Sequence, residues 1–86
     1  MYRVVFSGRA EKAFRGLRPP YEERIKETIQ RLGNNPRIPG TKRLGSAPVA
    51  QYRHRVGDYR ILFDIDEERK TVEVLDIRRR GGRTYK

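Results

Sequence analysis

The sequence predicts an α+β domain in which a two-helix hairpin packs on an antiparallel sheet, in the element order β-α-α-β-β-β. Three observations predict this fold. The chain has 86 residues, enough for a single domain with one modest core, so residues 1–86 are taken as one unit. Apolar residues recur with helical spacing in the first half and alternate in the second half. A segment rich in proline and glycine separates the two halves.

The first half of the chain predicts one strand and two helices. Residues 2–7 are rich in β-branched and aromatic side chains, which is typical of a strand. Ser7 can cap the next helix, which has one apolar stripe formed by Ala10, Ala13, Phe14 and Leu17. Pro19-Pro20 ends that helix and begins a second one, whose apolar face is formed by Tyr21, Ile25, Ile29 and Leu32. Residues 33–36 contain the glycine, asparagines and proline that end it.

The second half predicts three strands, at residues 51–56, 59–66 and 71–79. Gly57-Asp58 suits a tight turn between the first two of them. Residues 36–50 look irregular, and a loop of this length is uncommon unless it has a function or contains another element.

The tight turn fixes which side chains face each other across the hairpin. Val56 then faces Tyr59, Arg55 faces Arg60, His54 faces Ile61 and Arg53 faces Leu62. Arg53, Arg55 and Arg60 therefore project from one face, and the apolar residues of the other face pack against the helices. In the last strand, the same alternation places Leu75 and Ile77 on the arginine face. Because paired like charges cost stability, the Arg55–Arg60 pair favours a functional reason for this face.

The chain is strongly basic, with a formal net charge of +10. Its natural partners are phosphates or an acidic protein. The last strand ends in Arg78-Arg79-Arg80, and Arg83 and Tyr85 follow it. This cluster should lie near the Gly57-Asp58 turn, where guanidinium groups can bind phosphate and a tyrosine ring can stack on a base. A solvated basic surface with a flexible tail is the alternative that this pattern leaves open.

Several other classes of function are disfavoured. The chain has no cysteine and one histidine, so we expect no disulfide, metal site or cofactor. His54 is expected to be a buried, hydrogen-bonded residue of the core side rather than a base. No segment has the length of a membrane span, so a cytoplasmic protein is expected.

Residues 52–65 resemble the central hairpin of RelE-type toxins, in which a basic strand, a glycine turn and a Tyr-Arg pair recur. The opening residues 4–7, Asn35-Pro36, residues 42–45 and the ending from Ile77 to Tyr85 are similar to the same family, the RelE/ParE superfamily. The resemblance implies the toxin of a type II toxin–antitoxin system, a ribosome-dependent endoribonuclease that cleaves mRNA in the A site by attack of the 2′-hydroxyl on the adjacent phosphate. It also implies an acidic, RelB-like antitoxin as partner.

The resemblance also implies roles for individual residues. The expected catalytic set is Arg53, Arg55, Arg60, Arg80 and Tyr85. Since arginine keeps its proton, Tyr85 is expected to accept the 2′-hydroxyl proton, while Arg60 and Arg80 stabilise the charge on the phosphorane. The expected RNA-binding set is Lys42, Arg43, Arg53, Arg55, Arg78, Arg79 and Arg83.

Two other functions fit the same sequence. A ParE-like toxin shares the fold but poisons DNA gyrase, and it does not need the strand arginines together with a terminal tyrosine. A non-catalytic RNA- or ribosome-binding module would use the same basic face without cleaving.

Overall fold

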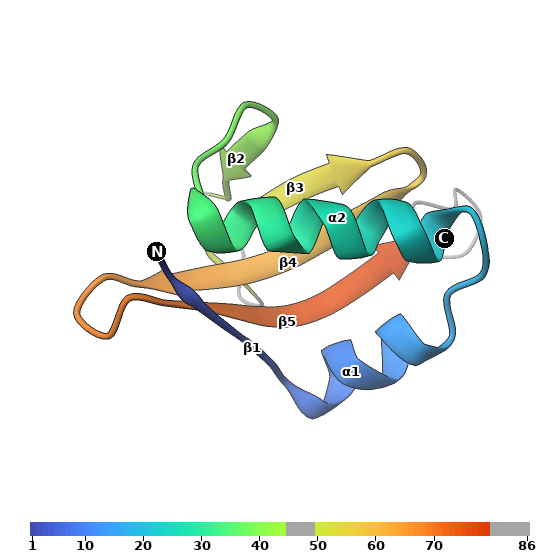
Figure 1. Cartoon of the computed structure of the whole chain (residues 1–86), viewed down its shortest axis with the longest axis horizontal. Helices are drawn as coiled ribbons and strands as arrows, with labels where there is room; N and C mark the ends of the chain where they lie inside the picture. Colours follow the sequence, from blue (N-terminus) through green and yellow to red (C-terminus); the bar gives the residue numbers. More distant parts are fainter. Residues whose placement is uncertain (45–49, 80–86) are drawn as a thin grey trace.

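The computed structural model describes residues 1–44 and 50–79, in which two helices cover one face of a five-stranded sheet (Figure 1). The elements in chain order are β1 (Arg3–Phe6), α1 (Gly8–Arg15), α2 (Tyr21–Asn34), β2 (Thr41–Arg43), β3 (Tyr52–Val56), β4 (Tyr59–Asp66) and β5 (Thr71–Arg79). The prediction of two helices packed on a sheet is confirmed. β2 is a further strand, inside the segment that the sequence predicts to be irregular. None of the described helices is long and apolar enough to cross a membrane.

The strands are arranged in the order β1-β5-β4-β3-β2. The predicted antiparallel pairing is confirmed for β3, β4 and β5, and β2, which was not predicted, also pairs antiparallel with β3. β1 instead pairs with β5 in parallel, so the sheet is mixed. Parallel neighbours need a long connection, and between β1 and β5 the chain forms both helices and the other strands.

The sequence signals for the helices correspond to contacts in the structure. The Ser7 hydroxyl caps α1 by accepting a hydrogen bond from the Ala10 amide at 3.1 Å. α1 buries Ala10, and α2 buries Ile25, Ile29 and Leu32 on its sheet-facing side. The helices therefore cover the sheet through the apolar stripes that the sequence predicts.

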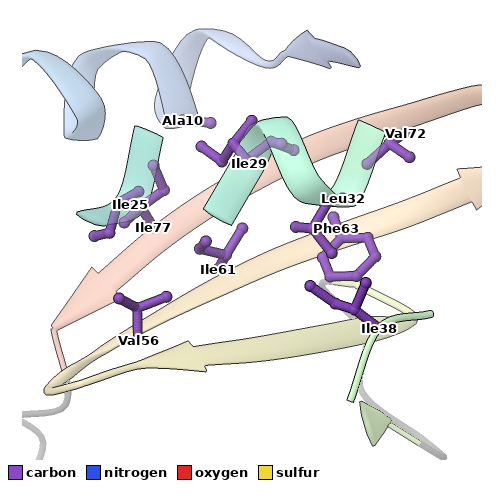
Figure 2. Packing of buried hydrophobic residues seen from close by; sticks show 11 residues of the cluster. Ala10, Ile25, Ile29, Leu32, Ile38, Val56, Ile61, Phe63, Val72 and Ile77 are labelled. Carbon is purple, nitrogen blue, oxygen red and sulfur yellow. The ribbon is translucent and has the colours of Figure 1, made fainter. Parts of the chain in front are cut away.

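The core lies between the helices and the sheet, as Figure 2 shows. Ile25 and Leu32 from α2 point toward Ile61 and Phe63 from β4 (Figure 2). All four side chains are fully buried. Burial of one such side chain contributes about 1.5–3 kcal/mol. This packing holds β4 in place, and with it the side chains on the other face of the sheet.

An irregularity in the β4–β5 pairing changes which residues face the core. Ile61 pairs with Ile77, Leu62 with Asp76, and Phe63 with Val74, so Leu75 is an extra residue in β5. Such a bulge reverses the alternation of side chains beyond it. The prediction that Ile77 shares the arginine face is therefore wrong: Ile77 is 5% exposed and belongs to the core. Asp76 and Arg78 take the arginine face instead.

Candidate nucleic-acid interface

Three arginines lie side by side on the sheet face that neither helix covers. Arg55 of β3 pairs with Arg60 of β4, and Arg60 pairs with Arg78 of β5. Directly paired residues project to the same side, and neighbouring strands are about 4.8 Å apart. The predicted pairing of Arg55 with Arg60 is confirmed. We call Arg55, Arg60 and Arg78 the arginine row.

Arg60, in the middle of the row, has an unsatisfied donor. Its Nε atom is buried and has no hydrogen-bond partner within residues 1–44 and 50–79. A buried donor without a partner costs about 1–3 kcal/mol. An anion placed against the row would satisfy this donor and also reduce the repulsion among three like charges.

Arg78 is held in place by a buried carboxylate. The Nε of Arg78 donates to Oδ2 of Asp76 at 2.8 Å, and Oδ1 of Asp76 accepts from the Ile77 amide at 2.8 Å. Asp76 is 6% exposed. The sequence prediction missed Asp76, although an aspartate inside a strand, two residues before an arginine, was a signal that could have found it.

The predicted RNA-binding residues divide between the two faces of the sheet. Lys42 pairs with Arg53, and Arg53 pairs with Leu62, so Lys42 and Arg53 extend the basic surface beside the arginine row. Arg43 and Arg79 take the other face. Arg43 pairs with Tyr52 and its guanidinium lies 5.9 Å from the centre of that ring, while Arg79 pairs with Tyr59.

The remaining predicted residues, Arg80, Arg83 and Tyr85, lie outside the described residues, so their roles stay predictions. Two other tyrosines near the row belong to the helix side. The ring centres of Tyr59 and Tyr21 are 4.8 Å apart, and the Tyr52 ring stacks on Phe63 with 5.7 Å between the ring centres.

His54 has the structural role that the sequence predicts. It is 7% exposed and lies on the helix side of β3, away from the arginine row. Its Nδ1 lies 3.0 Å from the Thr41 hydroxyl, which links β3 to β2. Burial, with a smaller contribution from Arg31, lowers the pKa of His54 below its ordinary value and favours the neutral ring.

The opposite end of the same sheet is acidic. A hollow of about 700 Å³ lies there, and its lining contains two arginines, Arg3 and Arg69, against five carboxylates, at Asp64, Asp66, Glu67, Glu68 and Glu73. Glu67 is held by a 2.8 Å hydrogen bond from the Tyr2 hydroxyl and an ion pair with Arg37, and these partners lower the pKa of its carboxyl. A phosphate would be repelled by this hollow and attracted to the arginine row, so the sheet face is negative at one end and positive at the other.

Comparison with known proteins agrees with this fold. The family model described as "ParE toxin of type II toxin-antitoxin system, parDE" matches residues 4–83. No curated protein matches the sequence.

Several solved structures are similar over nearly the whole chain. The toxin–antitoxin complex RelBE2 from Mycobacterium tuberculosis contains a chain with 29% identity and a TM-score of 0.79, over 92% of this chain and 98% of that one. The archaeal RelE–RelB complex from Pyrococcus horikoshii OT3 contains one with 27% identity and a TM-score of 0.78, over 94% and 97%. The RelBE complex of E. coli contains a chain with 26% identity and a TM-score of 0.78, over 92% of this chain and 96% of that one. The chain therefore belongs to the ParE toxin family of type II toxin–antitoxin systems, within the RelE/ParE superfamily.

Proposed function

We propose that the chain is a ribosome-dependent endoribonuclease of the RelE type, which cleaves mRNA in the ribosomal A site. The observation that carries this proposal is the arginine row, with the buried and unsatisfied Nε of Arg60 at its centre. Within the described residues this donor has no hydrogen-bond partner, and a phosphodiester supplies the negative oxygens that would satisfy it. The similarity to three RelE structures supports the same activity.

The proposed reaction is attack of the RNA 2′-hydroxyl on the adjacent phosphate. The 2′-oxygen forms a bond to phosphorus, the bond to the 5′-oxygen breaks, and the products are a 2′,3′-cyclic phosphate and a 5′-hydroxyl. Tyr85 would accept the 2′-hydroxyl proton, because arginine cannot act as a base. Arg60 and Arg80 would stabilise the phosphorane, Arg53 and Arg55 would hold the backbone in line, and one of these two would stabilise the leaving 5′-oxygen. That oxygen would take its proton from water to become the 5′-hydroxyl, and Tyr85 would return its proton to the solvent.

The position of the arginine row supports these roles. Oriented cations act on the charge that develops during the reaction when the protein holds them rigidly. Arg55 and Arg60 are part of the β3–β4 pairing, and β4 is anchored through fully buried Ile61 and Phe63. The row is therefore fixed by the core rather than by a loop.

The proposed partners follow from the charge and the relatives. A toxin with a net charge of +10 suits a RelB-like antitoxin that is acidic where it contacts the toxin, as well as the RNA of the ribosome. The similar RelE chains were solved in complex with RelB proteins. Action on the ribosome would place the toxin in the cytoplasm.

The test is a translating extract with a defined messenger, in which new 5′ ends are mapped by primer extension. We expect cuts in phase with codons that require ribosomes. Arg60→Ala should reduce cleavage by about 10²-fold or more, the size typical for loss of an oriented charge donor. Tyr85→Phe should cost about 10²-fold or more, as for a positioned proton carrier.

The control variant changes an arginine outside the arginine row. Arg9→Ala removes the same charge from the exposed side of α1 and should leave the cleavage pattern intact. An intact messenger at toxic doses would contradict the proposal. Unchanged cleavage by Tyr85→Phe would remove Tyr85 from the mechanism.

Gyrase poisoning is the second candidate, because the family model that matches the chain is that of ParE toxins. A supercoiling assay with purified gyrase decides between the two. Inhibition of supercoiling that survives Arg60→Ala, together with an uncut messenger, would favour gyrase. Salt-sensitive RNA binding with neither effect would favour a non-catalytic binding module.

A further inference from the structure

Asp76 is an acidic residue inside the most basic part of the sheet. It lies on the same face as the arginine row, pairs with Leu62, and is two residues before Arg78 in β5. A buried carboxylate is costly unless hydrogen bonds satisfy it. Both oxygens of Asp76 have partners at 2.8 Å: the Ile77 amide at Oδ1 and the Arg78 Nε at Oδ2.

These contacts leave Asp76 poorly suited to proton transfer. Its side chain is 8% exposed, and a cation is bound to one of its oxygens. A general base must reach the proton that it removes, and Asp76 presents little surface to a substrate.

The same contacts suit Asp76 to orienting Arg78. Nε is one of five N–H donors in the planar guanidinium group, so the contact with Asp76 leaves the two terminal nitrogens for another partner. The Arg78 side chain is 44% exposed, so these nitrogens can reach an anion. A guanidinium group fixed at Nε presents its remaining fork in a defined direction, which suits phosphate oxygens.

We propose that Asp76 is a positioning residue, which orients Arg78 in the arginine row toward the phosphate of the bound RNA. This inference rests on the proposed function. Arg60, which pairs with Arg78, has no comparable partner for its Nε among the residues that the structure describes. The row thus combines Arg78, which Asp76 orients before RNA binds, with Arg60, whose Nε could donate to a bound anion.

The test compares D76N, R78A and the double variant in the ribosome-dependent cleavage assay. Asparagine has one acceptor oxygen, so keeping it for the Ile77 amide places N–H donors against the Arg78 guanidinium. D76N should lower kcat by about 10-fold or more while KM changes by less than about threefold, because orientation acts mainly in the transition state. In the R78A background, D76N should change the rate by less than about twofold, because the two residues act as a unit.

D64N is the matched control. Asp64 lies on the same face, and its Oδ1 accepts from the Gln51 amide at 2.7 Å, but it lines the acidic hollow. Its kcat should stay within about twofold of the wild-type value. A wild-type rate for D76N, or an equal loss from D76N with and without Arg78, would overturn the role of Asp76.

Two further measurements keep the proposal testable. Should thermal melting show that D76N does not fold, R78K is measured in its place. Lysine keeps the positive charge, but its single ammonium group cannot bind Asp76 and also present two N–H donors to a phosphate. A wild-type rate for R78K would overturn the proposal. Should the wild-type protein fail to cleave, the proposed function is wrong, but the role of Asp76 can still be tested. The affinities of the wild type, D76N, R78A and the double variant are then measured with a short single-stranded RNA. Additive losses of binding free energy in the double variant would overturn the role of Asp76.

Discussion

At the scale of single residues, Arg60 combines two unfavourable features in one side chain. It is paired with Arg55 on one side and with Arg78 on the other, and its buried Nε has no hydrogen-bond partner in the described part of the chain. Like charges opposite each other destabilise a sheet, and an unsatisfied buried donor adds to that cost. Residues that function requires are often kept at the expense of stability.

Replacement of Arg60 by leucine should therefore stabilise the protein and inactivate it. We expect Arg60→Leu to raise the free energy of unfolding by about 1–2 kcal/mol, because it removes the unsatisfied donor and the like-charge contacts. Urea denaturation measures this change, and the cleavage assay should show no codon-phased products. Arg9→Leu serves as the control, because Arg9 is exposed on α1, and it should change the free energy of unfolding by less than about 0.5 kcal/mol. A loss of stability in Arg60→Leu would show that the guanidinium is satisfied in the native protein.

The sequence predicted part of this site and missed part of it. The Gly57-Asp58 turn fixed the register of one hairpin, so the positions of Arg55, Arg60 and His54 were all predictable. The spacing of Asp76 and Arg78 could have shown that they share a face, but which face they take was not predictable, because the bulge at Leu75 shifts the register and no residue pattern marks it.

At the scale of elements, the β3–β4 turn connects the arginine row to α2. Gly57 has a φ of +58°, and a Cβ atom on it would lie 2.9 Å from Cε1 of Tyr21. The turn therefore needs glycine for two reasons: its backbone is left-handed, and the first residue of α2 packs against it. The register of Arg55 with Arg60 begins at this turn.

Gly57→Ala should consequently destabilise the protein. We expect the free energy of unfolding to fall by about 1–3 kcal/mol, from the left-handed backbone and the close contact with Tyr21. Gly8→Ala is the matched control: a Cβ on Gly8 meets nothing within 4 Å, and this glycine begins α1. That variant should be as stable as the wild type or up to about 1 kcal/mol more stable. Thermal unfolding compares the two, and equal effects would refute the role assigned to the turn.

The sequence predicted the elements better than it predicted how they pair. The two helices and the three long strands were predictable because their apolar residues follow clear periods. β2 has three residues, too few for alternation to be visible. The parallel pairing of β1 with β5 depends on the path of the whole chain, which local patterns do not contain.

At the scale of the whole molecule, the position of the positive charge matters more than its total. The basic residues Lys42, Arg53, Arg55, Arg60 and Arg78 lie on one part of the open sheet face, and the acidic hollow lies at the other end. A field with this direction can orient an RNA strand as well as attract it.

The salt dependence of RNA binding separates local from total charge. Each phosphate contact that is lost should make the slope of log K against log salt shallower by about 0.7 for a single strand, so the triple change Arg55→Gln, Arg60→Gln and Arg78→Gln should reduce it by about 2. The control changes exposed Arg9, Lys12 and Lys26 to glutamine on the two helices, which removes the same charge from the other side of the sheet. Its slope should stay close to that of the wild type, because those exposed residues lie on the helices and not on the sheet face that carries the arginine row. Fluorescence anisotropy with a short single-stranded RNA measures both slopes. Equal slopes for the two triple variants would mean that total charge, and not the arginine row, governs binding.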